Sequence, residues 1–350
     1  MSALTLLQLN CWSGSTYNLN WKKKCFDSYE DPAKTEARYQ STIKQIRGLS
    51  PDVITLNECM PGKQYAEKFA SDLGYDLYYR TGVSGIILGS FHYPSINITE
   101  GDAILAKREY CLKPLGRKSL SGFVFSERFS LNTDNATQVI AVSVEKEGKL
   151  YVIGCTHFTA SVVDDEITRE LFKQITGNSR SEEPPKFSEK EIVEGQKAIN
   201  NGTKTRLQEA RLCIQFMNDT IQRHNLPSDT HIILAGDLNT VCGTPELNDI
   251  YSRGYKSVEL DSSCITWDVL NPNVIIQDKP ENEGSRGKVE EYLYDSFSKR
   301  NTLLDHVFVK GKPGSGGKEL EGRGDVVLDK MVDGVVASDH FGILATFVIK

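Results

Sequence analysis

Short apolar runs, each bounded by turn-forming residues, recur along the whole 350-residue chain. Such runs are typical of β-strands that are buried on one or both faces of a sheet. Because they extend from one end of the chain to the other, no position separates two independent cores, and we predict one domain over residues 1–350. The predicted strands are residues 4–9, 53–56, 76–79, 103–106, 139–144, 151–155, 231–235, 303–309 and 342–349.

Two stretches place apolar residues at helical spacing directly ahead of a predicted strand. The first is 35–49, which Pro51 ends, and the second is 207–221, which lies before Pro227. The residue before a proline disfavours continued helix, so a helix in the first stretch ends just before the next predicted strand. The chain therefore starts with a β-α-β unit.

The segment at about 161–203 interrupts this pattern. It is richly charged and contains two adjacent prolines, at 184 and 185. One short helix is expected in it, opened by Ser188 with Glu191 three residues on. Because charge and proline leave little to bury, we predict a surface insertion that is mobile or forms a lid. Two further polar stretches, 277–300 and 310–318, are predicted loops.

Composition and charge narrow the class of protein. Hydrophobic residues make up 39% of the chain and charged residues 25%, as in folded globular proteins. The net charge of −6 offers no overall positive field for nucleic acid, so any contact with a polyanion must be local or carried by metal ions.

The eight cysteines stand singly, without a C-x-x-C pair, which argues against a zinc site or a disulfide scaffold. Reduced thiols favour a cytoplasmic or nuclear location over a secreted one. No signal peptide is visible and no apolar stretch is long enough for a transmembrane span. Peripheral membrane contact stays open, and we expect a monomer.

Polar side chains stand at the ends of predicted strands in several separate places. A carboxylate or imidazole just beyond a buried strand is placed to point into a cleft at the edge of a sheet. A single aspartate there is usually a turn former or a helix cap, so the recurrence carries the prediction. The residues are Asn10, Glu58, His157, Asp237 with Asn239, and Asp339 with His340.

These residue types suit a magnesium site that handles phosphate. Asn10, Glu58 and Asp339 supply the hard oxygen ligands that Mg²⁺ prefers. His157 and His340 can donate hydrogen bonds to a phosphate. Zinc would prefer a compact set of histidines and cysteines, which the spacing of the histidines does not offer.

The strings around these residues resemble the motifs of the endonuclease/exonuclease/phosphatase superfamily, which includes deoxyribonuclease I, exonuclease III and neutral sphingomyelinases. The matching strings occur in order over residues 4–349. The most specific are Ala235-Gly236-Asp237-Leu238-Asn239 and Ala337-Ser338-Asp339-His340-Phe341-Gly342. The others are Pro51-Asp52-Val53-Ile54-Thr55-Leu56-Asn57-Glu58, Glu100-Gly101-Asp102-Ala103-Ile104-Leu105, Thr156-His157-Phe158 and Leu304-Asp305-His306-Val307-Phe308-Val309.

The resemblance implies an α/β fold, a four-layer α-β-β-α sandwich with two mixed, mostly antiparallel sheets, in a single catalytic domain. It also implies that Asn10 and Glu58 hold a catalytic Mg²⁺, with Asp339 near the metal and Mn²⁺ an expected substitute.

The same resemblance implies roles for the remaining polar residues. Asp237 orients or deprotonates the attacking water, while Asn239 and His157 bind the phosphate oxygens. His340, oriented by Asp305, stabilises the charge of the transition state. This division of labour is coherent, because metal and imidazoles neutralise the charge that builds up on the phosphate oxygens.

Two positions depart from the family pattern. Asn57 stands before the metal-binding glutamate, where the family often has glutamine. Leu303 stands two residues before Asp305, where the family often has arginine. Neither change removes a predicted ligand, but the second removes a positive charge near the substrate.

The substrate is not determined by the catalytic set, because this superfamily acts on nucleic acids, lipid head groups and inositol phosphates. The segment Thr266-Trp267-Asp268, followed by Asn271-Pro272, resembles one in bacterial sphingomyelinase-like members, although a tryptophan buried in a structural turn is an equal alternative. The apolar stretch 83–93 fits a lipid-touching loop or, more simply, a strand. Lys22-Lys23-Lys24 fits a solvated loop or a local patch for nucleic acid.

The preferred prediction is a sphingomyelinase-like hydrolase of phospholipid head groups. A nuclease or DNA-repair phosphodiesterase is the first alternative, and an inositol- or sugar-phosphate phosphatase the second. A binding module without activity is the weakest interpretation, because it would have no reason to keep the whole polar set.

Overall fold

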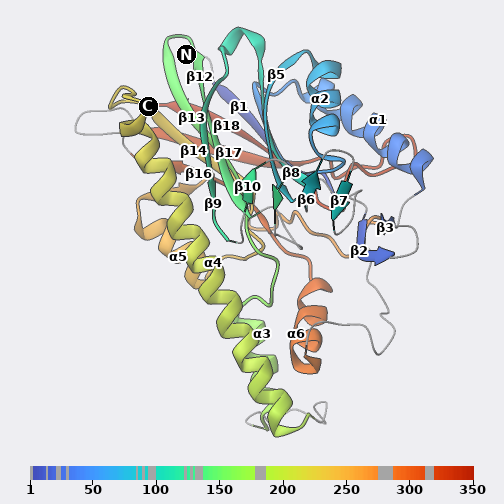
Figure 1. The fold of residues 1–350 in the computed structure, drawn as a ribbon. Helices are drawn as coiled ribbons and strands as arrows, with labels where there is room; N and C mark the ends of the chain where they lie inside the picture. The colour runs from blue at the N-terminus through green and yellow to red at the C-terminus, as the bar shows by residue number, and fades with distance from the viewer. Residues whose placement is uncertain are drawn as a thin grey trace.

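Two six-stranded β-sheets lie face to face in the computed structural model, with helices on their outer faces (Figure 1). The structure describes residues 3–12, 15–20, 25–28, 31–83, 86–88, 91–93, 100–121, 124–126, 129–130, 137–177, 187–274, 287–311 and 319–350.

The first sheet has the strand order β17-β18-β1-β4-β8-β5. Only β1 and β4 run parallel to each other, and the other neighbours are antiparallel. Its strands are β1 (Leu4–Asn10), β4 (Val53–Cys59), β5 (Tyr75–Val83), β8 (Glu100–Lys107), β17 (Leu320–Val327) and β18 (Gly342–Ile349).

The second sheet repeats this plan with the order β15-β16-β14-β13-β12-β9. Here β13 and β14 are the parallel pair. Its strands are β9 (Lys113–Ser119), β12 (Gln138–Lys146), β13 (Lys149–His157), β14 (His231–Asp237), β15 (Tyr255–Ser257) and β16 (Asp305–Lys310). The prediction of two mixed, mostly antiparallel sheets is therefore confirmed.

Helices cover both outer faces, which confirms the four layers. On the first sheet lie α1 (Pro32–Leu49) and α2 (Gly62–Leu73), whose apolar faces share a core with the strands. On the second lie α4 (Glu189–Arg223) and α5 (Pro245–Ser252). A third core fills the space between the sheets and includes Leu6, Ile104, Ile153 and Ile233, all fully buried.

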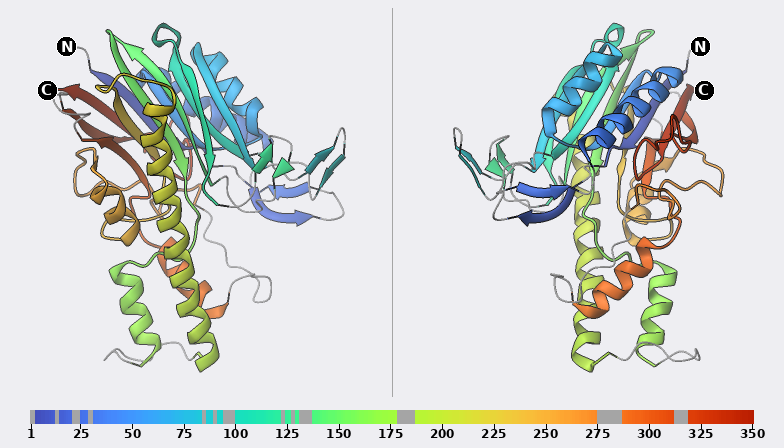
Figure 2. Two further views of the ribbon diagram at one scale, coloured as in Figure 1. Left: turned by 60° about the vertical axis from the view of Figure 1, so that its left-hand side comes forward. Right: turned by 90° about the vertical axis from the view of Figure 1, so that its right-hand side faces the viewer.

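A helical projection extends from the sandwich beyond one edge of the sheets (Figure 2). It consists of α3 (Glu166–Ile175), the first half of α4, and α6 (Lys288–Ser298). Its small core contains Val162, Ile175, Ile199, Val289 and Leu293. We use the name helical projection for these three helical segments.

The structure of the helical projection differs from several expectations about residues 161–203 and 277–300. Ser188 does open a helix with a full capping box, but this helix has 35 residues and is not short. The stretch also buries apolar side chains, contrary to expectation, because Val162, Ile175 and Ile199 pack against α6. Part of the predicted loop 277–300 is α6, whose Val289, Leu293 and Phe297 recur every four residues and are buried.

The nine predicted strands are present; 342–349 has the predicted bounds, and the other eight are longer or shifted at their ends. The apolar stretch 83–93 contains two short strands, β6 (Ile86–Leu88) and β7 (Phe91–Tyr93), so the strand interpretation holds there. Lys22-Lys23-Lys24 lies outside the described residues. The remaining short elements are β2 (Ser15–Asn20), β3 (Cys25–Ser28), the 3-10 helix η1 (Arg108–Tyr110), β10 (Val124–Ser126) and β11 (Phe129–Ser130).

Two expectations about the chain as a whole can be compared with the structure. Seven cysteines are free, as expected for reduced thiols: Cys11, Cys59, Cys111, Cys155, Cys213, Cys242 and Cys264. Among the described helices, none combines the length and the apolar character needed to cross a membrane. The assignment of residues 1–350 to a single catalytic domain, with an insertion at about 161–203, stays a prediction.

Candidate active site

The two parallel strand pairs bring predicted site residues to one edge of the sandwich. In the first sheet Asn10 ends β1 beside Asn57 of β4, and Glu58 follows directly. In the second sheet His157 ends β13 beside Asp237, which ends β14. Because the carboxyl ends of parallel strands meet at the same edge, four chain segments converge there.

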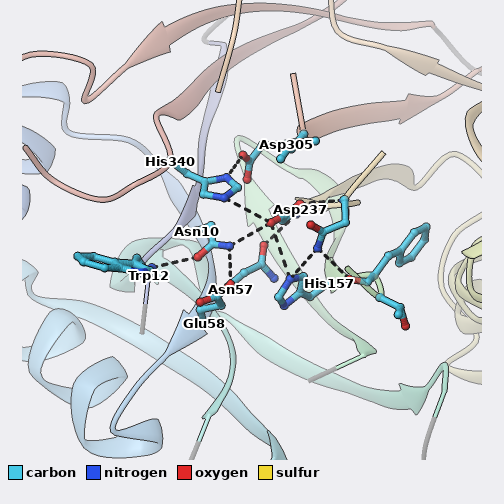
Figure 3. Close-up of polar contacts among 12 residues, drawn as sticks. Asn10, Trp12, Asn57, Glu58, His157, Asp237, Asp305 and His340 are labelled. Atoms are coloured by element: carbon cyan, nitrogen blue, oxygen red, sulfur yellow. Dashed lines mark hydrogen bonds and ion pairs between the residues drawn. The ribbon is translucent and has the colours of Figure 1, made fainter. Parts of the chain in front are cut away.

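Two more segments reach this edge from the opposite direction. Asp305 begins β16, which is antiparallel to β14, and it pairs in register with Asp237. Asp339 and His340 directly precede β18, the antiparallel neighbour of β1. All the predicted site residues therefore lie at one edge of the two facing sheets (Figure 3).

Asp237 lies at the centre of the group. Its Oδ2 accepts a hydrogen bond from Asn10 Nδ2 at 3.0 Å and lies 3.7 Å from His157 Nε2 and 3.9 Å from His340 Nε2. Its Oδ1 accepts from the backbone N–H of Asn239 at 2.8 Å. Asp237 is thus held in place while one oxygen faces two imidazoles.

Asn239 continues the group towards His157. Its Nδ2 lies 3.2 Å from His157 Nε2 and donates to the carbonyl oxygen of Phe158 at 3.0 Å. The backbone after Phe158 is fastened in turn by α4, because the buried Glu209 accepts hydrogen bonds from the N–H and hydroxyl groups of Thr159. The side-chain amide of Asn239 and the imidazole of His157 therefore lie side by side at the site.

A second carboxylate orients His340. Asp305 Oδ2 lies 2.8 Å from His340 Nδ1, and both side chains are buried. Burial opposes the charge on His340, but the Asp305 carboxylate, with Asp237 and Asp339, raises the pKa of His340 well above its usual value. Burial opposes the Asp305 carboxylate too, yet His340 holds the pKa of Asp305 below its usual value. Both shifts favour the ionised forms, an imidazolium at His340 and a carboxylate at Asp305.

The Thr266-Trp267-Asp268 segment supports the same pair. The Thr266 hydroxyl accepts hydrogen bonds from the backbone N–H groups of Leu304 and Asp305. The Trp267 ring contacts the His340 ring edge-on, with centroids 5.2 Å apart, while its indole N–H donates to the carbonyl of Ser298. Trp267 is thus a packing residue that also touches the site.

The predicted metal ligands lie next to this group. Of the predicted ligands, Glu58 shares a set with His157 and Asp237 in which each offers an atom within 4.8 Å of the others, a spacing that a metal ion can bridge. Asp237, Asp305 and His340 form a second such set among the described residues, and Asp339 is in neither. Asn10 donates to Glu58 Oε1 at 3.0 Å, so it presents its amide nitrogen to the carboxylates here. Asp339 accepts from the Ser338 hydroxyl at 3.2 Å and interacts electrostatically with Glu58.

The electrostatics of the site indicate a missing positive charge. Burial raises the pKa of Asp237 above its usual value and raises the pKa of Asp339 to about 7. Such shifts mean that buried carboxylates lack sufficient counter-charge. A bound cation would supply that charge, so the cluster fits a metal site, whose identity stays a prediction.

Three residues at the site have left-handed backbone conformations, which are uncommon for residues other than glycine. They are Trp12, Glu58 and Asn239, with φ angles of 53°, 53° and 47°. The backbone N–H of Trp12 donates to Asn10 Oδ1 at 3.0 Å. Residues of this kind persist where the surroundings enforce them, often at functional sites.

Sequence reasoning did not identify Gln8 or Asp102 as parts of the site. Gln8 is a fully buried amide within the otherwise apolar end of β1, and it contacts Asn57 and Asp305. Asp102 lies on β8, and burial raises its pKa to about 7. A polar residue on the inward side of a predicted strand was the available signal for Gln8.

Comparisons with known proteins agree with this arrangement. Residues 7–340 match the model described as the Endonuclease/Exonuclease/phosphatase family. No curated protein sequence matches the chain at a significant level.

Among solved structures, a humanized D. rerio TDP2 with 14 mutations is 15% identical with a TM-score of 0.56, over 99% of this chain and 100% of that one. The beta toxin of Staphylococcus aureus is 19% identical with a TM-score of 0.51, over 98% and 99%. The human Nocturnin catalytic domain is 14% identical with a TM-score of 0.52, over 100% and 94%. At these identities the likeness shows the fold alone.

Proposed function

The chain belongs to the endonuclease/exonuclease/phosphatase family, and from that premise we propose that it is a Mg²⁺-dependent phosphodiesterase that hydrolyses a phospholipid head group. Its class, a metal-dependent hydrolase of phosphoric esters, follows from the family. The observation that carries the catalytic part of the proposal is the convergence of Asn10, His157 and His340 on one carboxylate oxygen of Asp237.

Asn10, Glu58 and Asp339 would hold the metal ion. When bound, the ion supplies positive charge that polarises the phosphate ester and favours an ionised attacking water. Oxygen donors suit Mg²⁺, with Mn²⁺ as a substitute. Asn10 would bind through Oδ1 after its amide, which turns Nδ2 to Glu58 and Asp237 in this structure, has rotated. The raised pKa of Asp339 supports this part of the proposal, because that carboxyl is buried without sufficient counter-charge.

The side chains around the metal would divide the remaining work. Asp237 holds the attacking water and accepts its proton, since its Oδ2 faces the centre of the site. His157 and Asn239 donate hydrogen bonds to the phosphate oxygens. His340, kept protonated by Asp305, stabilises the negative charge that grows in the transition state. Water attacks phosphorus directly, so no covalent intermediate is required.

Charge favours a substrate with a single phosphate over a long polyanion. The chain carries a net charge of −6, and Leu303 occupies the position where the family often has arginine. Arg38, a buried cation near the site, is engaged with the backbone carbonyls of Cys11 and Trp12. Binding of nucleic acid depends on many phosphate contacts to basic side chains, so this balance supports a lipid head group.

The test compares substrates under one set of conditions. Release of phosphocholine from sphingomyelin in mixed micelles, nicking of plasmid DNA and release of phosphate from inositol phosphates would each be measured with Mg²⁺, with Mn²⁺ and with EDTA. The Asp237→Asn protein is the control for contaminating activity. Mg²⁺-dependent release of phosphocholine that EDTA and Asp237→Asn both abolish is expected.

Faster turnover of DNA than of sphingomyelin would identify the protein as a nuclease. That outcome has a precedent in the fold, since D. rerio TDP2 has been solved with a single-strand DNA product. Faster turnover of inositol phosphates would make it a phosphatase. Either result would overturn the lipid substrate and keep the metal-dependent mechanism.

A further inference from the structure

Two buried amide side chains, Gln8 and Asn57, lie directly behind the reacting groups. Both are fully buried. Gln8 Nε2 donates to Asn57 Oδ1 at 2.8 Å and to Asp305 Oδ1 at 3.2 Å. Gln8 is on β1 of the first sheet and Asp305 is on β16 of the second, so this hydrogen bond crosses from one sheet to the other.

Asn57 makes a second link between the sheets. Its Oδ1 also accepts from the backbone N–H of Asp237 at 3.1 Å. Its Nδ2 donates to Asp102 Oδ1 at 2.7 Å and to the carbonyl of Thr156 at 3.1 Å. Asn57 therefore holds β14 next to β4 at the point where both strands end in site residues.

The pair is fully hydrogen-bonded, which distinguishes it from polar groups that are buried by accident. Gln8 Oε1 accepts from the Thr55 hydroxyl at 2.6 Å, so each donor and acceptor atom of both amides has a partner. The rest of the space between the sheets is largely apolar, with the hydrogen bond from Gln138 Nε2 to the carbonyl of Arg80 at 2.9 Å as a further polar link between the sheets. Satisfied polar networks hold their members in one arrangement, whereas apolar contacts permit sliding.

Each contact of the pair bears on a group of the proposed mechanism. Gln8 fixes one oxygen of Asp305, so that the other oxygen faces His340 Nδ1. Asn57 fixes the backbone of Asp237 and is itself the neighbour of Glu58. The two amides thus connect the strand that carries Glu58 with the strands that carry Asp237 and Asp305.

We propose that Gln8 and Asn57 are positioning residues, which set the first sheet against the second so that Glu58, Asp237 and His340 come together in one geometry. This inference rests on the proposed function.

The first experiment removes the amide of Gln8 while keeping its volume. Gln8→Leu is expected to lower kcat about 10- to 100-fold with KM changed less than about threefold, because small displacements of reacting groups reduce turnover more than binding. Thr220→Val is the matched control, since it removes a fully buried hydroxyl that donates to the carbonyl of Phe216 on α4 and has no part in the amide network. Its melting temperature is expected to fall, with kcat nearly unchanged.

The second experiment exchanges the two side chains. Gln8→Asn combined with Asn57→Gln keeps the total volume and both amides, and such volume-conserving changes are the best tolerated in cores. We expect kcat of the exchanged protein to return to within about threefold of wild type. A folded exchange protein as slow as Gln8→Leu would contradict the proposal, as would equal kcat losses in Gln8→Leu and Thr220→Val.

A spectroscopic measurement separates this inference from the proposed function. The proton between His340 Nδ1 and Asp305 is expected to give a downfield ¹H NMR resonance, which would be identified by its absence from His340→Ala. The resonance is expected to shift in Gln8→Leu and to stay in place in Thr220→Val. If wild type hydrolysed no phosphate ester, the proposed function would fail, and this signal would still decide: an unshifted resonance in Gln8→Leu overturns the positioning role.

Discussion

The site edge of the sandwich and the helical projection are both reached by α4, but different interactions hold them together. At the site edge the side chains are buried and polar, and hydrogen bonds such as that between Gln8 and Asp305 join the two sheets. In the projection a small apolar core is surrounded by exposed ion pairs, such as that of Lys288 with Glu191.

The same helix lies in both environments. The second half of α4 packs Ala210, Cys213 and Met217 into the core of the second sheet. In the first half Gly195 lies so close to Val289 that a Cβ atom would meet that side chain at 2.2 Å. The difference teaches that the site edge depends on the geometry of particular polar groups, whereas the projection depends on general packing.

The largest effect is expected at the site edge. Asp237→Asn and His340→Ala should each lower kcat by about 10²–10⁴, the usual range for a group that moves a proton or stabilises charge. The melting temperature of Asp237→Asn should change little, because asparagine keeps the shape of the side chain, whereas His340→Ala should lower it, because Asp305 then stays buried without its partner. Steady-state kinetics and thermal unfolding of both proteins measure this.

The double variant refines that expectation. Because both groups act in one transition state, Asp237→Asn with His340→Ala should cost much less than the product of the single losses. Multiplicative losses would mean separate roles. Near-normal kcat of Asp237→Asn at saturating substrate would mean that this side chain is only a turn former.

The next effect is expected where the two regions join. Arg206 and Glu246 form a fully buried ion pair at 2.8 Å, and the guanidinium also donates to the carbonyls of Ser161 and Val162. Arg206→Met leaves Glu246 buried without its partner, which costs about 3–5 kcal/mol in the free energy of unfolding. Denaturant unfolding measures this loss.

Arg211 on the same helix is the control. It pairs with Asp249 at 3.2 Å, but its side chain is half exposed. Arg211→Met should therefore cost less than about 1 kcal/mol. Equal losses of unfolding free energy in the two proteins would show that burial does not determine how much each ion pair stabilises the fold.

The two regions also differ in how far the sequence predicted them. The site edge was predicted because its residues follow strongly apolar strands, and the parallel pairs β1/β4 and β13/β14 bring their ends together. Gln8 was missed because its role depends on Asp305, which is 297 residues away in the chain. No local pattern reports a contact of that range.

The projection was largely missed because its apolar residues are few among many charges. Val289, Leu293 and Phe297 have helical spacing, but a surrounding polar stretch suggested a loop. Ile199 finds its partners on α6, far along the chain. Tertiary packing therefore decided the structure of this segment where the local pattern was weak.

A smaller effect is expected for the metal. Glu58→Gln removes a charged oxygen ligand at a strand end and should weaken Mg²⁺ affinity about tenfold or more, with the fold unchanged. The rise in melting temperature with added Mg²⁺ measures affinity without requiring turnover. Glu194→Gln in the projection, where the side chain is 53% exposed, is the control and should bind Mg²⁺ as wild type does.

The smallest effect is expected at the far end of the projection, where Ser188 and Glu191 form the capping box of α4. Hydrogen bonds from the backbone and hydroxyl of Ser188, and then the ion pair with Lys288, lower the pKa of Glu191 to about 2. A carboxylate whose pKa is lowered by folding stabilises the helix end above its ordinary pKa of 4.5, and this contribution declines as pH falls towards about 2. Hydrogen-exchange protection of the first turn of α4 should therefore decrease between pH 5 and pH 3, with turnover at neutral pH unaffected by Ser188→Ala.

Glu191→Gln keeps the capping hydrogen bond but cannot ionise, so its first turn should lose that pH dependence. If wild type and Glu191→Gln showed the same dependence, the acid sensitivity would come from the sandwich, and the two regions would not be energetically separate.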